Sequence, residues 1–201
     1  MFDNPLIIKD KNVFFWSDTH FGHKKEFVWG KRGFTSVEEH DIHLVNAING
    51  NVGENDILFH LGDFCLNYTQ EQFENILFQI KCNNIHYING NHNSRIKQFE
   101  HDLNNPLRHK VKYMGNYVEA IINNQMIVMM HYPIYSWNAM RKGSWMIHGH
   151  EHGAVLNHNQ NGIDGKILDI GVDNFPCPLS FESVKTIMAN KIVKQVGHHE
   201  F

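Results

Sequence analysis

The sequence predicts an α/β fold in which strands and helices alternate and an antiparallel part is added to a parallel one. In the first half, short runs rich in β-branched and aromatic residues are separated by segments whose apolar residues recur at helical spacing. Beyond about residue 110, strand-like runs follow one another with only short turns between them. We therefore expect parallel strands connected by helices in the first half and antiparallel pairing in the second.

The strands expected in the first half are residues 13–17, 56–60 and 85–88. Each ends directly before a polar or glycine-containing turn. In the second half, Asn123 and Asn124 are expected to form the two-residue turn of a hairpin. The strands expected there are 111–114, 117–122, 126–130, 145–148 and 166–172.

Three helices are predicted by capping residues followed by apolar positions at helical spacing. Ser36 and Glu39 have the form of a capping box at the start of the first helix, which runs to about residue 49. Thr69 and Ser180 are expected to cap the second and third helices. The buried face of the first helix is expected to carry Val37, Asp41, Leu44, Val45 and Ile48. The second helix carries a core-facing stripe of Phe73, Ile76, Leu77 and Ile80.

Composition favours one catalytic domain that binds metal. The chain has 201 residues, 16 of which are histidine, and a formal net charge of −3. This length suits a single domain spanning residues 1–201, and metal ligation is a frequent use of imidazole. Because lysines and arginines are scattered, we expect no broad cationic face for extended nucleic acid.

The cysteines indicate a reducing compartment. Cys65, Cys82 and Cys177 are far apart and include no Cys-x-x-Cys pair, which argues against a disulfide framework and against a thiolate zinc site. Residues 1–11 lack the pattern of a signal peptide, and no apolar run is long enough to span a membrane. We therefore expect a soluble, cytoplasmic protein with no membrane partner.

Five short motifs place oxygen and imidazole donors directly after the strand-like runs. In chain order they are Asp18-Thr19-His20, Gly62-Asp63, Gly90-Asn91-His92, His131 and Gly149-His150-Glu151-His152. The absence of thiolates favours hard or borderline ions. Two divalent ions about 3.5–4 Å apart can neutralise a phosphoester, generate hydroxide and hold an in-line geometry. The series therefore predicts a two-metal centre that cleaves phosphoesters, with the Asp63 carboxylate as the shared bridge.

These ordered motifs resemble the calcineurin-like metallophosphoesterase superfamily, and in particular its small bacterial and phage-type members. The resemblance covers almost the whole chain and includes the neighbouring residues in 17–23, 61–64 and 131–134. It implies a four-layer α/β/β/α sandwich, with two mixed β-sheets flanked by helices and a dinuclear metal site at the C-terminal loops of the strands. It also implies that Asp63 bridges the two ions. One ion would be bound by Asp18, His20 and His152, and the other by Asn91, His131 and His150.

The resemblance further implies that His92 is the catalytic histidine, which donates a proton to the leaving oxygen or stabilises charge there. The chain departs from the family at Asn93, where the family usually has Asp or Glu. An amide can orient His92 but supplies no charge that would favour its protonated form. We therefore expect a reduced rate or a shifted pH optimum rather than loss of metal. Asn93→Asp is expected to raise activity at neutral or alkaline pH, and an unchanged pH–rate profile would contradict this.

Substrate contacts are predicted less specifically. His23 and Arg95 lie just past ligand turns and are candidate contacts for substrate phosphate, although solvated loop positions are equally compatible. Residues 22–33 and 138–144 are expected to determine specificity. Trp137 is expected either to wall the cleft or to pack in the core.

Four further histidines are expected to have structural roles or to lie on the surface. His60 and His148 lie at strand ends beside the ligands, where a supporting hydrogen bond or simple burial is expected rather than ligation. His40 and His43 are three residues apart on the first helix and are expected on its surface.

Taken together, the residues and the resemblance predict a metal-dependent hydrolase. We expect it to cleave a phosphodiester or a nucleotide-like phosphate ester or anhydride by in-line attack of a hydroxide held between the ions, assisted by His92. Manganese is the first expectation for both ions, with iron, zinc or nickel as alternatives. The expected partner is a small phosphate ester or nucleotide. Two alternatives stay open: a metal- and phosphate-binding module without catalysis, suggested by Asn93, and a nuclease, which the missing basic stripe disfavours.

Overall fold

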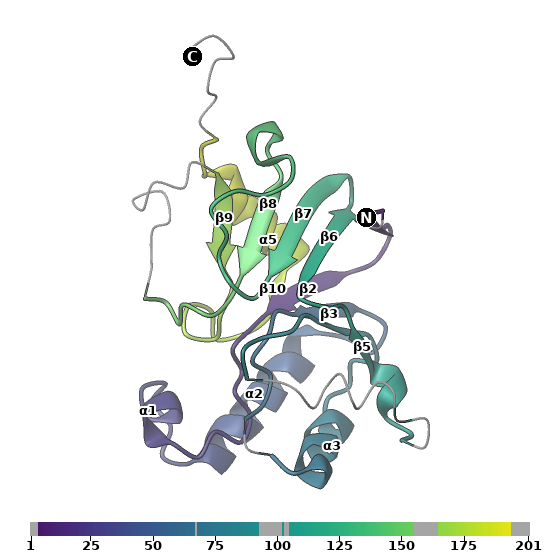
Figure 1. Cartoon of the computed structure of the whole chain (residues 1–201). Coiled ribbons are helices and arrows are strands. Elements are labelled where there is room, and N and C mark those ends of the chain that lie inside the picture. Colours follow the sequence, from purple (N-terminus) through teal and green to yellow (C-terminus); the bar gives the residue numbers. More distant parts are fainter. Residues whose placement is uncertain (1–3, 67, 93–101, 103–104, 155–164, 194–201) are drawn as a thin grey trace.

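The computed structural model describes residues 4–66, 68–92, 102, 105–154 and 165–193, which form two five-stranded β-sheets with flanking helices (Figure 1). In spatial order, the first sheet contains β10 (Leu179–Ser180), β2 (Val13–Trp16), β3 (Ile57–His60), β4 (Ile85–Tyr87) and β5 (Val111–Tyr113). Its strands β2 to β5 pair in parallel, and β10 pairs antiparallel to β2.

The second sheet combines parallel and antiparallel pairs. It contains, in spatial order, β1 (Leu6–Ile8), β6 (Tyr117–Ile122), β7 (Gln125–Met130), β8 (Trp145–His148) and β9 (Lys166–Asp169). Strands β6 and β7 form the predicted hairpin, and the others pair in parallel. Its turn residues Asn123 and Asn124 have φ angles of 47° and 69°, as a two-residue hairpin turn requires. The predicted class, two mixed sheets flanked by helices, is confirmed.

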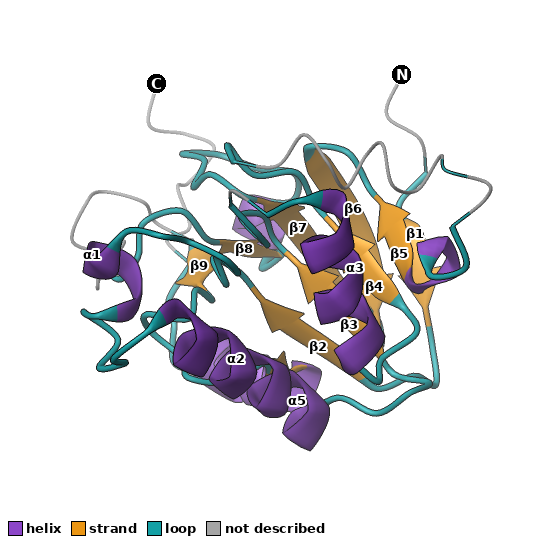
Figure 2. Cartoon of the chain, turned by 90° about the horizontal axis from the view of Figure 1, so that it is seen from below, coloured by secondary structure: helices purple, strands orange, loops and turns teal. Residues whose placement is uncertain are grey.

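Two helices cover the outer face of the first sheet. These are α2 (Val37–Asn51) and α3 (Gln70–Gln79), and Figure 2 shows both in front of the strands. Their core-facing side chains include Leu44, Ile48, Phe73 and Leu77, which pack with Trp16 of β2. The helical spacing read from the sequence therefore predicted most of the packed positions correctly, although Val37 is only half-buried.

A second core lies between the two sheets. Along β2, Val13 and Phe15 belong to this core, whereas Trp16 belongs to the helix side, as the alternation of a strand dictates. The rings of Phe15 and Phe59 stack there with centroids 5.8 Å apart. Helix α5 (Phe181–Ala189) closes this core with Phe181, Val184 and Met188.

The outer face of the second sheet is covered by the segment that follows β7. Trp137 packs there on Val128, Met146 and Ile167, so it is a core residue. The short 3-10 helix η2 (Met140–Lys142) lies in the same segment. A second 3-10 helix, η1 (Arg108–Lys110), leads into β5.

The predicted helix caps are present. Thr69 and Gln72 form a complete capping box at α3, and Ser180 accepts a hydrogen bond from the backbone of Ser183 at α5. At α2, Ser36 accepts from the Glu39 backbone N–H at 3.1 Å, but the Glu39 side chain bonds to Thr35 rather than returning to the cap.

The sequence did not predict the two 3-10 helices or three other short elements. Strands β1 and β10 are two to three residues long, and α1 (Glu26–Trp29) is a single turn inside the loop expected at 22–33. Short segments give little periodicity to detect. No helix among the residues described above is both long and apolar enough to cross a membrane.

Candidate metal centre

The predicted ligands lie at the carboxyl ends of strands from both sheets. Strands β2, β3 and β4 of the first sheet run in parallel, as do β7 and β8 of the second, so their ends meet at one edge of the molecule. Beyond these ends lie Asp18, His20, Asp63, Asn91, His92, His131, His150 and His152. The structure brings all eight predicted residues into one cluster.

The turns that carry the ligands have an unusual backbone. Left-handed φ angles occur at Asp18 (58°), His20 (52°), Asp63 (53°), His150 (73°) and His152 (48°). Such a conformation costs about 1–3 kcal/mol for a residue with a side chain and persists only where the surroundings enforce it. Five of the predicted ligands share this conformation, so the surrounding structure must hold their turns in place.

Hydrogen bonds and close packing hold these turns together. The Asp18 N–H donates to the Gly62 carbonyl at 3.1 Å, and the His20 N–H donates to the Asp63 carbonyl at 2.9 Å. A Cβ atom on Gly90 would collide with the Asp63 carboxylate and backbone nitrogen. Glycine at position 90 therefore permits the close approach of two ligand turns.

Asp18, His20 and His152 form the first group that could hold a metal ion. His20 Nε2 lies 3.2 Å from His152 Nε2, and His152 Nε2 lies 3.9 Å from Asp18 Oδ1. Ser17 Oγ and the His150 N–H donate to the Asp18 carboxylate at 2.6 and 3.0 Å. Burial nevertheless raises the pKa of Asp18 to about 6.

The second group surrounds Asp63, and Asp18, Asp63 and His131 form a further set of donors that could hold a metal ion. Asp63 Oδ2 lies 3.6 Å from His131 Nε2 and 3.7 Å from His20 Nε2. Asn91 Oδ1 lies 2.8 Å from His131 Nε2 and 3.0 Å from His150 Nδ1. Asp63 thus lies between the two groups, where a bridging carboxylate is expected.

The protonation pattern of this cluster fits a bound cation. His131 Nδ1 lies 2.8 Å from the Leu61 carbonyl oxygen, which can only accept, so Nδ1 carries the hydrogen. Burial lowers the pKa of His131, and its Nε2 atom then presents a lone pair to the oxygens of Asp63 and Asn91. Facing acceptors repel one another unless a cation lies between them, so the donor set suits a metal ion with nitrogen and oxygen ligands.

His20 shows the same electron-rich character. Burial lowers the pKa of His20 to about 2, which keeps the ring neutral. Its Nε2 atom points into the cluster, and its buried Nδ1 atom has no hydrogen-bond partner among the described residues. A neutral imidazole of this kind is a good ligand.

His92 lies at the exposed rim of the cluster, as do the predicted ligands Asn91 and His152. Its side chain is 44% exposed, and its Nε2 atom lies 4.0 Å from Asp63 Oδ2. Its backbone N–H donates to Asp63 Oδ1 at 3.0 Å, which fixes its turn against the cluster. His92 is therefore beside the centre and open to a substrate.

Asp173 and Arg32 support the cluster and were missed in the sequence. Asp173 Oδ2 lies 2.7 Å from His152 Nδ1, and Arg32 donates to both Asp173 oxygens at 3.0 and 2.8 Å. Arg32 also donates to the Asp18 carbonyl at 2.8 Å. Burial would raise the pKa of Asp173, but the bonds from His152 and Arg32 outweigh it and lower that pKa. Its position beyond β9 was the available signal, since each predicted ligand also follows a strand.

His40 was expected on the surface of α2, and this prediction is wrong. The residue is fully buried, with its Nε2 atom 2.9 Å from Arg32 Nη1 and its Nδ1 atom 2.9 Å from Asp41 Oδ1. Asp41 in turn accepts hydrogen bonds from the Gly22 N–H and the Tyr68 hydroxyl. His40 is thus a structural link between α2 and the loop at Arg32; its neighbour on the helix, His43, is exposed as predicted.

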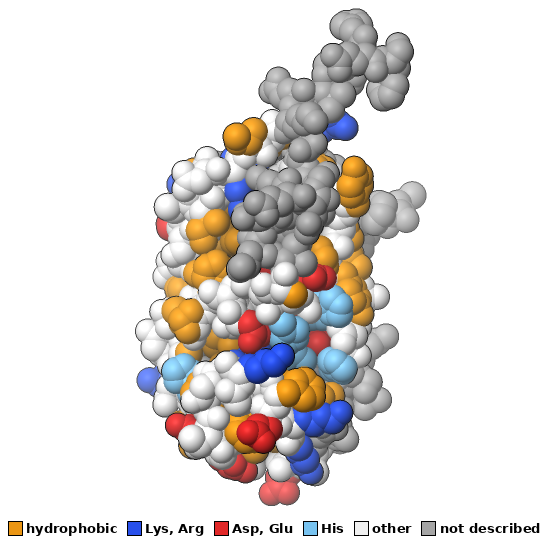
Figure 3. Space-filling view, turned by 90° about the vertical axis from the view of Figure 1, so that its left-hand side faces the viewer, with side chains coloured by type: hydrophobic (Ala, Val, Ile, Leu, Met, Phe, Trp, Pro, Cys, Tyr) orange, Lys and Arg blue, Asp and Glu red, His pale blue; other side chains and the backbone are white. Residues whose placement is uncertain are grey.

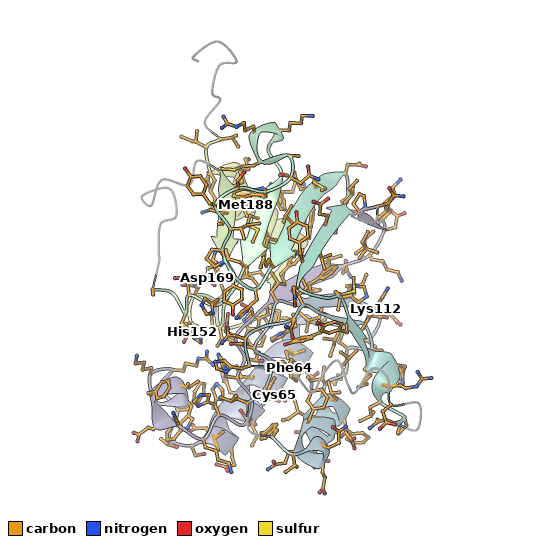
Figure 4. The ribbon with its side chains drawn as sticks, viewed as in Figure 1. Phe64, Cys65, Lys112, His152, Asp169 and Met188 are labelled. Carbon is orange, nitrogen blue, oxygen red and sulfur yellow. The ribbon has the colours of Figure 1, made fainter. Side chains whose placement is uncertain are left out.

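His60 and His148 are buried beside the centre and are not among the groups able to hold metal in the described structure. His60 Nε2 bonds Thr19 Oγ1 at 3.0 Å, and His148 Nδ1 lies 2.8 Å from the Gly149 carbonyl. In Figure 4, His152 and Asp169 lie close together between the two halves of the molecule, and the Gly153 N–H donates to Asp169 at 3.4 Å.

A cleft of about 520 Å³ opens beside the first group of ligands. Among the candidate substrate contacts, His23 lines this cleft, whereas Arg95, like Asn93, lies outside the described residues. The residues that line it include several from 22–33 but none from 138–144. Figure 3 shows histidines gathered on this face, with cationic and hydrophobic side chains beside them.

Comparison with known proteins supports the fold. No family model matches the chain. Uncharacterized protein MJ1445 of Methanocaldococcus jannaschii is 26% identical over 194 residues, which cover 93% of this chain and 97% of that protein. The crystal structure of the protein of unknown function AQ665 from Aquifex aeolicus aligns with a TM-score of 0.66 at 18% identity, covering 89% of this chain and 100% of that one. These similarities carry no activity with them.

Proposed function

We propose that this chain is a two-metal phosphoesterase that resembles the calcineurin-like metallophosphoesterases. One observation carries the proposal: eight polar residues from five separate strand ends, selected from the sequence as ligands and catalytic histidine, converge in one cluster. Four of the eight, Asp18, His20, Asp63 and His131, are buried, and burying such polar groups together is costly unless they are partnered, as a bound cation would partner them.

The positions of the donors support the roles that the resemblance implies. Asp18, His20 and His152 would hold one ion, while Asn91, His131 and His150 would hold the other. Asp63 would bridge them. Bound divalent ions, with manganese as our first choice, would neutralise substrate phosphate and lower the pKa of water.

His92 would act on the leaving group. It borders both the cluster and the cleft. An imidazole in this position can donate a proton to the departing oxygen or stabilise its charge. The substrate would be a phosphodiester or a nucleotide-like ester or anhydride.

The three cysteines are compatible with a cytoplasmic location for this activity. Cys65, Cys82 and Cys177 are all free thiols, and two of them are buried. A reducing compartment would keep them in this state.

A panel of phosphate substrates tests the proposed function. Protein supplied with Mn²⁺ is incubated with monoesters, diesters, cyclic nucleotides and nucleotide anhydrides, and product release is measured. His92→Ala is expected to lower turnover by about 10²–10⁴-fold while metal binding stays intact. His109→Ala, which changes an exposed histidine remote from the cluster, is the matched control. Metal binding without turnover of any substrate would refute the enzyme and favour a silent binding module.

A further inference from the structure

The cleft borders only one of the two proposed ion sites. Its lining includes His20, His92 and His152 but none of the predicted ligands of the second ion. The opposite wall comes from the loop that contains α1 and contributes Lys25 and Phe27. A substrate in this cleft would therefore extend from the centre past His92 towards α1.

This direction identifies which part of the substrate the cleft would hold. In the proposed function, on which this inference rests, His92 assists the departing oxygen. The leaving group that carries this oxygen must therefore lie next to His92, in the cleft. The cleft volume of about 520 Å³ is within the range that accommodates a small organic ligand.

The α1 wall offers a surface for a flat ring. Phe27 is 57% exposed although it is a large aromatic residue, and its ring meets that of His23 with centroids 5.4 Å apart. Val28 and Leu66 add further apolar lining. A planar base that stacks on Phe27 would cover this exposed surface.

The same wall is cationic, although the chain as a whole has a formal charge of −3. The charged lining side chains are Lys25, Lys31, Arg32 and Asp173. Arg32 and Asp173 bind each other, whereas Lys25 and Lys31 are exposed and form no ion pair with any described carboxylate. Lys25 Nζ lies 5.9 Å from the Phe27 ring centroid, so a positive charge accompanies the aromatic surface. An anionic group is therefore expected next to the stacked ring.

We infer that the cleft binds a nucleoside monophosphate as leaving group, and hence that the substrate is a nucleotide joined to a second group through a phosphoanhydride. Water adds to the phosphorus of the second group, forming a new P–O bond. The bond from that phosphorus to the bridging oxygen breaks, and its electron pair leaves with the nucleoside monophosphate. One proton of the water is released to the surroundings, and charge on the departing oxygen is stabilised or protonated by His92. Phe27 stacks on the base, while Lys25 and Lys31 bind the phosphate of the nucleoside monophosphate.

Calorimetric binding of AMP tests the inference independently of turnover. The protein is titrated with AMP, adenosine and inorganic phosphate, in chelator and in Mn²⁺. AMP is expected to bind at least about tenfold more tightly than adenosine or phosphate, and both Phe27→Ala and the double variant Lys25→Ala/Lys31→Ala are expected to weaken it by about tenfold. The matched controls are Phe78→Ala, an exposed aromatic on α3, and Lys24→Ala, an exposed lysine that does not line the cleft. Equal AMP affinity in wild type and both cleft variants would overturn the inference.

Kinetics separate this inference from the proposed function. Diadenosine diphosphate releases AMP, whereas bis(p-nitrophenyl) phosphate releases a ring without phosphate. In Lys25→Ala/Lys31→Ala, the loss of kcat/KM on diadenosine diphosphate is expected to exceed the loss on the nitrophenyl diester by about tenfold. Turnover of the diester with equal losses on both substrates would overturn the cleft assignment and leave the phosphoesterase standing. If neither these two substrates nor any member of the wider panel is cleaved, the proposed function fails, and AMP titration alone decides what the cleft binds.

Discussion

Asp173 shows how a single residue could set the properties of the centre. Its carboxylate holds His152 Nδ1 at 2.7 Å and thereby directs Nε2 towards Asp18 and His20. Asp173→Asn keeps an acceptor but removes the charge that makes the imidazole a stronger ligand. We expect Mn²⁺ affinity to fall by about tenfold or more, measured by calorimetry. Asp10→Asn is a matched exposed control, and equal affinities in all three proteins would show that Asp173 does not support the site.

His60 is expected to make the metal-free protein sensitive to acid. Burial, together with the nearby His131, lowers the pKa of His60 from 6.5 to about 3. Its Nε2 atom bonds Thr19, and its Nδ1 atom has no hydrogen-bond partner in the described structure. The unfolded chain therefore binds a proton that the folded chain excludes. The free energy of unfolding should fall as the pH drops below about 6.5 towards 3, by up to about 1.4 kcal/mol per pH unit from this group.

Urea unfolding in chelator at several pH values measures this effect. His60→Gln keeps a donor for Thr19 but does not titrate, so its free energy of unfolding should fall less steeply between pH 7 and about 5 than that of wild type. Parallel pH dependence in the two proteins would exclude His60 as a source of acid sensitivity.

At the residue scale, the sequence predicted the residues of the central cluster better than the residues that hydrogen-bond to them. Asp18 and Asp63 were found because each directly follows an apolar run and belongs to an ordered motif. Asp173 has the same placement after a strand but no motif around it. The burial of His40 depends on Arg32 and Asp41, and such contacts arise only when distant segments fold together.

At the scale of elements, α3 depends on its first turn. Thr69 Oγ1 accepts from the Gln72 N–H at 3.2 Å, and the Gln72 side chain accepts from the Thr69 N–H at 3.0 Å. Thr69→Ala removes half of this box and should lower the free energy of unfolding by about 1 kcal/mol. Urea unfolding measures the change, with Gln70→Ala expected to alter it by less than about 0.5 kcal/mol. A Thr69→Ala protein as stable as wild type would mean that the cap contributes nothing.

The predictability of the elements follows from their length and packing. Helices α2 and α3 were predicted because their apolar stripes recur over several turns, and the hairpin was predicted because Asn123 and Asn124 tolerate positive φ angles. Strand β10 has only two residues and depends on pairing with β2, so its sequence carries no period. The single turn of α1 was not predicted because it is also too short to show a period and lies in a glycine-containing loop.

At the scale of the whole molecule, metal should join the two sheets. The predicted ligands come from β2, β3 and β4 of the first sheet and from β7 and β8 of the second. An ion that binds only the folded chain stabilises it by about 2.7 kcal/mol at a concentration one hundred times its Kd. We expect Mn²⁺ to raise Tm by about 5–10 °C relative to chelator, measured by calorimetry. Asp63→Asn should lose most of this shift, and an unchanged Tm in wild type would argue against a structural link through metal.

The fold was predicted from two sources, the order of the strands and helices and the family resemblance. Alternating strands and helices predicted the α/β class, while the two mixed sheets were implied by a resemblance carried by the ligand motifs. Pairing of β1 with β6 could not be read from the sequence, because it joins Leu6 to Ala120 across most of the chain. Such long-range register is determined by packing in the shared core.

Anomalous X-ray scattering from crystals grown with Mn²⁺ tests the dinuclear centre most directly. We predict two manganese peaks per chain, one beside Asp18, His20 and His152 and one beside Asn91, His131 and His150, with the Asp63 carboxylate between them and a separation of about 3.5–4 Å. No peak in this cluster, or a single peak that Asp63 does not contact, would contradict a two-metal centre.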